Sequence, residues 1–124
     1  MKIAITAWYS EPGWDGDTVC RQAERAEAMG FHSYWLPENH FGDPRASPSP
    51  LTLLAAAAVR TGRLKLGTTS YLLPIRHPIQ AAEEVAVVDQ LSRGRLILGL
   101  GRGIQDAVFD VFGVPAREKR ARFE

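Results

Sequence analysis

The chain has 124 residues, of which 45% are hydrophobic, and it carries 15 Lys and Arg against 14 Asp and Glu. This length and composition are typical of one globular domain with a buried core, and they exclude an intrinsically disordered chain. The near balance of charge gives no support for a nucleic acid or a membrane surface as the main partner, because proteins that bind either are usually strongly basic.

The cysteine content and the short apolar runs of the sequence favour a cytoplasmic protein. Cys20 is the single cysteine, so no internal disulfide can form, and a reducing compartment is expected. The first residues, "MKIAITAW", are predicted to be a strand and not a signal peptide. The most apolar run, residues 51–59, is far shorter than a membrane-spanning helix.

Four short, apolar, β-prone segments are predicted to be strands. They lack the clean alternation of inward and outward residues that marks a half-exposed sheet, so we expect strands that are buried on both faces. The predicted strands are residues 2–8, 32–36, 64–69 and 95–100.

Three helices are predicted between these strands. Asp17 is the expected N-cap of the first, Ser49 followed by Pro50 starts the second, and Pro78 opens the third. Apolar residues at helical spacing should face the sheet. They are Val19, Ala23, Ala26 and Met29 in the first helix, Leu51, Leu54, Ala55 and Ala58 in the second, and Ile79, Ala82, Val85, Ala86 and Val88 in the third.

Glycines at positions 30, 62 and 94 recur at intervals of 32 residues, each at the expected end of a helix. Glycine there supplies the left-handed residue that follows a helix C-terminus. A regular repeat of strand and helix predicts a parallel sheet, either an open doubly wound sheet or a (β/α)8 barrel of the TIM type. Because a complete barrel needs about 250 residues, residues 1–124 would hold only about its first four βα units, the N-terminal half of the barrel domain.

In both architectures the carboxyl ends of the strands carry the functional residues. In "GLGRG", after the fourth predicted strand, Gly99 and Gly101 fit two glycines of the dinucleotide fingerprint, but its third position falls on Ile104. The fingerprint usually lies in the turn after the first strand, whereas this segment follows the fourth predicted strand, so a Rossmann site is weakly supported. These glycines can still let a flat ligand approach the backbone, and Arg102 can pair with a phosphate or carboxylate. A plain tight turn with a surface arginine is the alternative.

The segment "PENHF", residues 37–41, follows the second predicted strand. A histidine such as His40 can give or take a proton near neutral pH, and Glu38 can orient a neighbour or accept a hydrogen bond from a ligand. A polar loop that satisfies its own backbone explains the same residues equally well, so both interpretations stay open. The sequence has no metal-ligand spacing, no G-x-S-x-G elbow and no P-loop.

Four segments together resemble the N-terminal part of the bacterial luciferase-like, flavin-dependent monooxygenases. The most specific is residues 67–103, which begins "GTTSYLLPIRHP" and ends "GLGRG". The others are the opening "MKIAITAW", the segment "WLPENHF" and the tail "FDVFGVPAREKRARFE". The resemblance runs in order over nearly the whole chain.

This resemblance implies a (β/α)8 barrel that binds reduced FMN in its mouth and uses O2, through a C4a-peroxyflavin, to oxidise a small organic substrate. It implies a separate NAD(P)H-dependent flavin reductase as a frequent source of the reduced flavin. It also implies a homodimer through the second and third helices, where the alanines of residues 55–58 would allow close approach.

The resemblance also implies roles for individual residues. The segment that matches "ENHF" would provide the acid–base histidine, and "TTS" would pack against the flavin ring, with a non-prolyl cis peptide placed at Thr69–Ser70. "GLGRG" would put Gly101 near the reactive edge of the flavin and Arg102 towards its phosphate. The predicted site consists of His40 and Asn39 as catalytic residues and Glu38, Thr69, Ser70, Gly101 and Arg102 as cofactor-binding residues, with no metal ligand.

Asn39 is a departure from the luciferases, which carry two adjacent histidines at this point. The first of these, their key catalytic histidine, matches Asn39, which forms hydrogen bonds but cannot shuttle a proton at neutral pH. Light emission from a long-chain aldehyde is therefore not expected, and His40 is the remaining candidate for proton transfer. Gly101 also replaces a cysteine of the luciferases, which is expected to open space near the flavin.

Two further hypotheses stand beside the FMN monooxygenase. One is a deazaflavin (F420)-dependent oxidoreductase of the same superfamily, which transfers hydride on the same barrel. The other is a non-catalytic fragment or flavin-binding relative, because four βα units lack the loops after strands seven and eight that commonly hold phosphate in barrels. On this reasoning, residues 1–124 alone are expected to bind flavin weakly or not at all.

Overall fold

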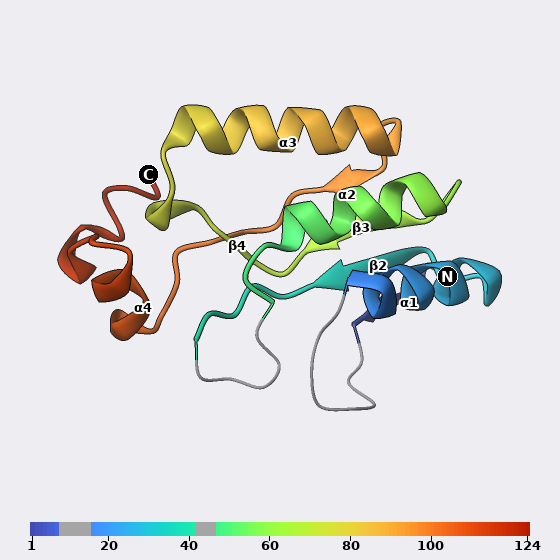
Figure 1. Cartoon of the computed structure of the whole chain (residues 1–124), viewed down its shortest axis with the longest axis horizontal. Helices are drawn as coiled ribbons and strands as arrows, with labels where there is room; N and C mark the ends of the chain where they lie inside the picture. Colours follow the sequence, from blue (N-terminus) through green and yellow to red (C-terminus); the bar gives the residue numbers. More distant parts are fainter. Residues whose placement is uncertain (8–15, 42–46) are drawn as a thin grey trace.

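The computed structural model describes residues 1–7, 16–41 and 47–124, and strands and helices alternate along these parts of the chain (Figure 1). The predicted α/β class with a parallel sheet is confirmed. Within the described residues no helix has both the length and the apolar character needed to cross a membrane.

Four short strands form one parallel sheet, and their spatial order is the order of the chain. Neighbouring strands are in register, with Tyr34 of the second strand opposite Ile5 of the first and Leu66 of the third. In a doubly wound sheet the strand order reverses at a switch point. Here the order does not reverse, and the wall of a barrel has this same unreversed order. The strands are β1 (Ala4–Thr6), β2 (Ser33–Leu36), β3 (Lys65–Thr68) and β5 (Leu96–Ile97).

The fourth predicted strand is divided in the structure. After β5, a second parallel pair forms between β4 (Tyr71–Leu72) and β6 (Leu100–Gly101). The side chain of Thr68 accounts for the interruption, because its Oγ1 donates to the carbonyl oxygen of Gly99 and accepts the Gly99 N–H, both at 3.0 Å. At this point the Thr68 side chain takes the place of backbone hydrogen bonds between neighbouring strands. Backbone pairing resumes between β4 and β6.

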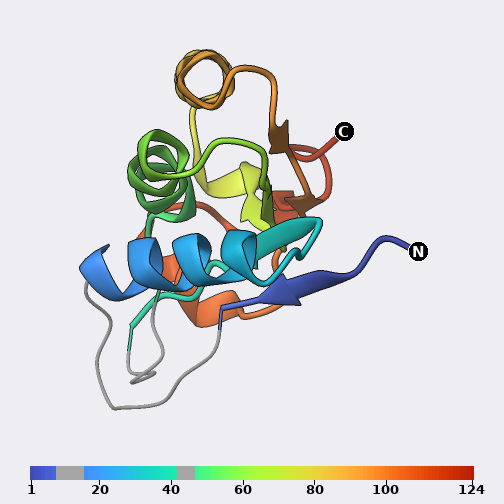
Figure 2. The same cartoon turned by 90° about the vertical axis from the view of Figure 1, so that its right-hand side faces the viewer.

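Three helices lie in a row along the sheet, each packed against its neighbour (Figures 1 and 2). They are α1 (Gly16–Ala28), α2 (Pro50–Arg60) and α3 (Pro78–Ser92). A shorter helix, α4 (Asp106–Val111), lies on the side towards which the strands run (Figure 1). The 3-10 turns η1 (Leu73–Ile75) and η2 (Ala116–Glu118) follow β4 and α4.

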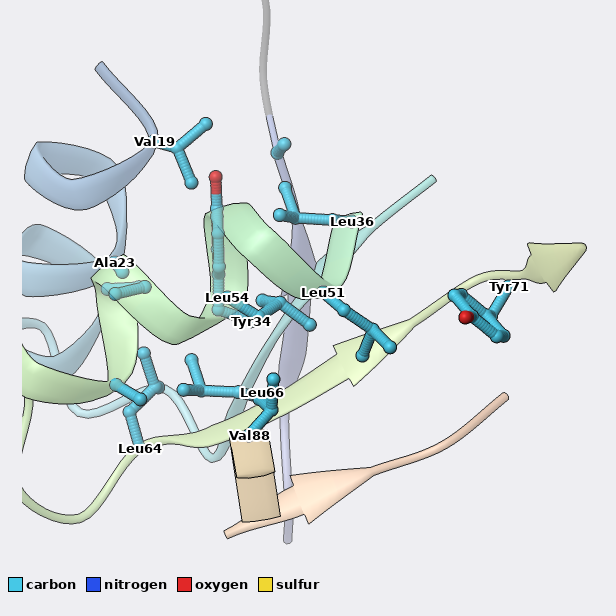
Figure 3. Close-up of a cluster of buried hydrophobic side chains, with 14 of the residues drawn as sticks. Val19, Ala23, Tyr34, Leu36, Leu51, Leu54, Leu64, Leu66, Tyr71 and Val88 are labelled. Atoms are coloured by element: carbon cyan, nitrogen blue, oxygen red, sulfur yellow. The ribbon is translucent and has the colours of Figure 1, made fainter. Parts of the chain in front are cut away.

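The core lies between this row of helices and the sheet (Figure 3). Leu36 and Leu66 of the strands and Leu54 of α2 have no exposed surface. The buried Tyr34 keeps its hydroxyl group satisfied, because it donates to Oε1 of Gln22 at 2.9 Å. This core fixes the strands whose carboxyl ends carry the candidate site.

Arg95, at the start of β5, is a buried cation that ties the end of α2 to the sheet. Each of its five guanidinium N–H groups has an acceptor at 2.6–3.0 Å. Burial lowers the pKa of Arg95 below its ordinary value. The acceptors are the carbonyl oxygens of Ala58, Thr61, Leu64 and Ser92 and the hydroxyl group of Thr61.

The predicted helix-end glycines are confirmed at two of three positions. Gly30 and Gly94 have left-handed backbones, with φ of 81° and 73°. Gly62 does not, because α2 ends at Thr61 in an extended conformation with φ of −124°. The reason is tertiary: the carboxylate of Glu27 accepts the N–H groups of the three residues after Thr61, which satisfies this turn without a left-handed residue.

Two expectations about α1 are wrong. The helix begins at Gly16, so Asp17 lies within its first turn, where it forms an ion pair with Arg60 of α2, and it is not the N-cap. Met29 follows the end of the helix and is 64% exposed. The rest of the predicted apolar stripe is buried in the core, namely Val19, Ala23 and Ala26.

The apolar stripe of α3 faces two different surfaces. Ala81 and Val88 are buried, whereas Ile79, which the periodicity places inward, is 63% exposed. A groove of about 610 Å³ runs along α3 beside β5. Its apolar lining includes Ala82, Val85 and Ala86 of the predicted stripe, together with Leu96, Leu98 and Leu100.

Candidate functional site

Glu38, the first charged residue after β2, is the centre of a buried hydrogen-bond network. Its side chain has no exposed surface. Oε1 of Glu38 lies 2.7 Å from both Nε2 of His40 and Nη2 of Arg76, and Oε2 accepts the backbone N–H of Leu72 at 2.7 Å. Arg76 also donates through Nη1 to the carbonyl oxygen of Leu72 at 2.7 Å. The carboxylate of Glu38 is therefore directed at donors of the protein itself.

Asn39 and His40 point in different directions although they are adjacent. In a strand-like segment the side chains of residues i and i+2 share one side, and the residue between them points to the other side. Glu38 and His40 are joined at 2.7 Å, and Asn39 lines a cavity. The His40 side chain is only 5% exposed, and its ring packs edge-on against Phe112 with 4.9 Å between the centroids. His40 thus lies behind the cavity wall.

The cavity, of about 360 Å³, lies between the segments that follow β2 and β3 and the loop that joins β6 to α4. It brings together four of the predicted site residues, Asn39, Ser70, Gly101 and Arg102. Thr69 is not among the described residues that line it. The remaining lining residues are Leu72, Gly103, Ile104, Gln105, Val108 and Phe109.

The turn between β3 and β4 has the backbone feature that the resemblance implies. The peptide bond between Thr69 and Ser70 is cis. The N–H of Thr69 donates to the carbonyl oxygen of Leu36 at 2.8 Å, which joins the end of β3 to the end of β2. Ser70 therefore reaches the cavity from a turn that the sheet holds in place, and it offers one hydroxyl group there.

Gly101 lies against Ser70, and this contact corrects one expectation. A Cβ added to Gly101 would lie 2.7 Å from Cβ of Ser70 and closer still to its hydroxyl group. The space that the missing side chain leaves is filled by Ser70 and is not opened to a ligand. Glycine at this position is what allows β6 to lie so close to the turn before β4.

Arg102 brings an exposed positive charge to the cavity. A guanidinium group presents several N–H donors in a fork that matches a phosphate or a carboxylate. The next residue, Gly103, has φ of 79°, a left-handed conformation that glycine adopts without strain, and it turns the chain from β6 towards α4. The loop therefore places a cation beside an apolar wall, which suits a flat anionic ligand.

Arg76 and Tyr71 belong to the network behind the cavity, although the sequence interpretation assigns no role to them. The guanidinium carbon of Arg76 lies 3.9 Å from the centroid of the Tyr71 ring, and the Tyr71 hydroxyl group donates to Oε2 of Glu84 at 3.0 Å. Burial raises the pKa of Tyr71, the Arg76 cation opposes this, and the hydrogen bond to Glu84 adds to it, so the net shift is upward. Arg76 lies within "LPIRHP", but its partner Glu38 is 38 residues away in sequence.

A parallel repeat of strand and helix, with strands in chain order and a cavity beyond their carboxyl ends, defines a domain of the (β/α)8-barrel type. A model of the luciferase-like monooxygenase family matches residues 2–124. The chain belongs to this family, so the resemblance seen in the sequence is confirmed.

Similar proteins in this family carry the names of monooxygenases. Limonene 1,2-monooxygenase from Rhodococcus erythropolis is 38% identical over 101 residues, which is 82% of this chain and 26% of that enzyme. The crystal structure of monooxygenase RslO1 from Streptomyces bottropensis covers 99% of this chain and 40% of its own, with 36% identity and a TM-score of 0.90. The structure of the oxygenating constituent of 3,6-diketocamphane monooxygenase from Pseudomonas putida, in complex with FMN, matches 99% of this chain and 36% of its own chain. The identity is 25% and the TM-score is 0.90.

A protein that is named for another cofactor shares the fold. The coenzyme F420-dependent tetrahydromethanopterin reductase from Methanopyrus kandleri covers 92% of this chain and 30% of its own, with 31% identity and a TM-score of 0.69. The chain spans less than half the length of each of these four proteins. The predicted fold is confirmed: the chain corresponds to an N-terminal portion of a luciferase-like (β/α)8 barrel.

Proposed function

We propose that the protein is part of a flavin-dependent monooxygenase that uses reduced FMN and O2 to oxidise a small organic substrate. The observation that carries this proposal is the cavity that gathers Asn39, Ser70, Gly101 and Arg102 from three strand ends. The family match and the FMN complex of the similar Pseudomonas putida protein support it. Reduced FMN, when bound, would supply the electrons that activate O2, and a separate NAD(P)H-dependent reductase would supply the reduced FMN.

The residues around the cavity fit a flavin. The side chains of Leu72, Val108 and Phe109 provide an apolar wall for a flat ring system. Asn39 can donate and accept hydrogen bonds at the polar edge of the ring, and Arg102 can pair with a phosphate group. These residues bind and orient the cofactor in this proposal, and the wall excludes water from one side of it.

The geometry gives the two predicted catalytic residues separate roles. Asn39 lines the cavity, so we assign to it the contact with the bound ligand. His40 is 5% exposed and is hydrogen-bonded to Glu38 behind the wall, so we assign to it a supporting role. Glu38 is placed with His40 in this supporting role, because its carboxylate is already engaged by three donors.

An F420-dependent oxidoreductase that transfers hydride is the second candidate. The similar Methanopyrus kandleri reductase favours it. Because FMN and F420 are both flat and anionic, an apolar wall with one exposed arginine accepts either. Parallel titrations with FMN and F420 separate the two candidates, and binding of F420 without binding of FMN would replace the monooxygenase proposal.

The proposal is tested by titrating the 124-residue chain with FMN into the millimolar range and following the flavin fluorescence. Weak binding is expected, because the chain spans less than half of its relatives. Arg102→Met should weaken binding about tenfold through loss of a charge-assisted contact. Arg117, also exposed but outside the cavity lining, provides the control, and Arg117→Met should leave the affinity unchanged.

Two results would contradict the proposal. One is unchanged flavin fluorescence when the full-length protein is titrated with FMN in either redox state. The other is an equal loss of affinity in Arg102→Met and Arg117→Met, which would indicate non-specific attraction to positive charge. Tight binding by the 124 residues would instead support a self-sufficient flavin-binding module, the third hypothesis.

A further inference from the structure

A closed ring of hydrogen bonds lies directly behind the cavity wall. Oε2 of Glu38 accepts the N–H of Leu72, the carbonyl oxygen of Leu72 accepts Nη1 of Arg76, and Nη2 of Arg76 donates to Oε1 of Glu38, each at 2.7 Å. Nε2 of His40 meets the same Oε1 at 2.7 Å. These four groups, namely the side chains of Glu38, His40 and Arg76 and the backbone of Leu72, are termed the Glu38 bracket.

Arg76 supplies the charge that a buried carboxylate needs. A carboxylate without contact with water is strongly disfavoured unless it is paired and hydrogen-bonded. The Glu38 side chain has no exposed surface, and that of Arg76 is 19% exposed. The planar guanidinium group reaches Glu38 and the carbonyl oxygen of Leu72 at once, which the single ammonium group of a lysine would not do with the same geometry. The Tyr71 ring, 3.9 Å below, supports it.

The bracket also fixes the state of His40. An ionised carboxylate only accepts hydrogen bonds, so Nε2 of His40 carries the proton that joins it to Glu38. The ring is held by this bond on one side and by the edge-on contact with Phe112 on the other. His40 therefore holds its segment of chain in place from behind the wall.

Two cavity residues are held by the bracket. Asn39 lies between Glu38 and His40, whose side chains are joined on the far side, so the backbone of this segment directs the Asn39 side chain towards the cavity as long as that bond holds. Leu72 is held at both its N–H and its carbonyl oxygen, and it pairs with Gly101 between β4 and β6. We infer that Arg76 is a positioning residue, which acts through Glu38 to set the place of Asn39 and Leu72 in the cavity wall.

The importance of this role for catalysis rests on the proposed function, but its effect on the wall does not. The test therefore uses one measurement without flavin and one with it. In the 15N-labelled chain, long-range 1H–15N spectra show which ring nitrogen of His40 is protonated, with the signal assigned by its loss in His40→Gln. Amide spectra report the N–H of Leu72, and titration with FMN reports the cavity.

The probe variant is Arg76→Met, which removes the charge and both donors at a similar side-chain length. It should shift the amide signal of Leu72, change the ring-nitrogen signals of His40 because Arg76 no longer shares Oε1 of Glu38 with it, and weaken FMN binding about tenfold. Arg60→Met is the matched control, because Arg60 is also paired with carboxylates, those of Asp17 and Glu24, on the surface of α1 and α2. It should leave all three measurements unchanged.

Arg76→Lys and Glu38→Gln test the geometry of the bracket. Lysine keeps the positive charge but not the two parallel N–H donors of the guanidinium group. Compared with Arg76→Met, Arg76→Lys should therefore bring the His40 signal closer to the wild type than the Leu72 signal. Glutamine offers one acceptor oxygen to three donors, so Glu38→Gln should disturb both signals.

The inference is wrong if Arg76→Met, folded by circular dichroism, leaves the His40 and Leu72 signals as they are in the wild type. If Arg76→Met unfolds, Arg76→Lys and Glu38→Gln decide the question, and unchanged signals in both overturn the inference. A full-length protein that shows the bracket signals but binds no FMN would refute the proposed function and not the bracket.

Discussion

At Gly101 the absence of a side chain decides how closely β6 approaches the turn before β4. Gly101→Ala should force the side chain of Ser70 or the backbone of β6 to move, because the added Cβ would lie 2.7 Å from Cβ of Ser70. Overpacking of this kind typically costs about 1–3 kcal/mol. Urea denaturation measures this loss in the free energy of unfolding, and FMN titration should show weaker binding by the same variant.

A double variant provides the check on this prediction. Ser70→Gly vacates the space, so Gly101→Ala combined with Ser70→Gly should regain most of the lost stability. Gly62→Ala is the control, because a Cβ added at Gly62 meets nothing within 4 Å and its backbone is not left-handed. A double variant no more stable than Gly101→Ala would show that the added methyl group clashes with backbone and not with Ser70.

Asn39 and His40 should lose different properties when they are truncated. Asn39→Ala removes an amide that lines the cavity, so FMN affinity should fall about tenfold while the free energy of unfolding changes by less than about 0.5 kcal/mol. His40→Ala removes a buried ring and one donor of Glu38, so it should lower the free energy of unfolding by about 2 kcal/mol or more. Urea denaturation and FMN titration of both variants measure the two effects.

A different result would assign His40 a direct role in catalysis. If His40→Ala keeps its stability and its FMN affinity but the enzyme loses turnover, His40 transfers a proton and is not only a support. Equal losses of affinity and stability in both variants would show that Asn39 also acts through packing and not through contact with the ligand.

At the scale of elements, Glu27 ties α1 to the turn after α2. Its carboxylate accepts the N–H groups of Gly62, Arg63 and Leu64 at 2.7–3.1 Å. Burial raises the pKa of Glu27, but these three N–H donors and the charge of Arg63 outweigh it, so the net pKa lies below its ordinary value of 4.5. The ionised form is therefore favoured in the folded state.

This shift predicts how stability depends on pH. A lowered folded-state pKa gives stability that is fully present above the ordinary value of 4.5 and is lost as the pH falls through the lower, folded-state value. Glu27→Gln should lower the free energy of unfolding by about 1 kcal/mol at neutral pH. Urea denaturation in steps of pH should show the difference between wild type and variant shrinking below about pH 4.5. A difference that stays constant at all pH values would contradict this origin.

Local sequence signals predict the elements where no distant residue intervenes. Pro50 and Pro78 start helices as expected, and Gly30 and Gly94 supply the left-handed residues that follow helices. The same signal fails at position 62 because Glu27, 35 residues earlier, satisfies that turn. A one-dimensional pattern carries no information about such a partner.

The sequence predicts which residues meet at the site better than it predicts which of them line the cavity and which are buried behind it. Parallel strands deliver the loops at their carboxyl ends to one edge, which is why Asn39, Ser70 and Arg102 line the same cavity. The direction of Glu38 is not predictable in this way, because it depends on Arg76, which is 38 residues distant. The resemblance places these segments in one site, but only the structure separates the residues of the wall from those behind it.

At the scale of the whole molecule, two apolar surfaces remain uncovered in the described part of the chain. One is the groove along α3 beside β5, which lies at the end of the sheet. A further βα unit of a barrel would lie beside this last strand and cover the groove. The other consists of exposed side chains on the neighbouring helices α2 and α3, which a barrel would leave on its outside. The second surface is therefore the better candidate for contact between subunits.

A homodimer through α2 and α3 remains a prediction, and Val87 is the residue that tests it. Val59 of α2 and Val87 and Leu91 of α3 are 67%, 55% and 44% exposed. Val87→Glu would bury a charge in such an interface, so the dissociation constant of the dimer, measured by analytical ultracentrifugation, should rise about tenfold or more. Met29→Glu is the control, because Met29 is similarly exposed, at 64%, beyond the end of α1. A dimer unaffected by Val87→Glu would place the contact elsewhere, and a wild-type monomer at all concentrations would exclude it for these 124 residues.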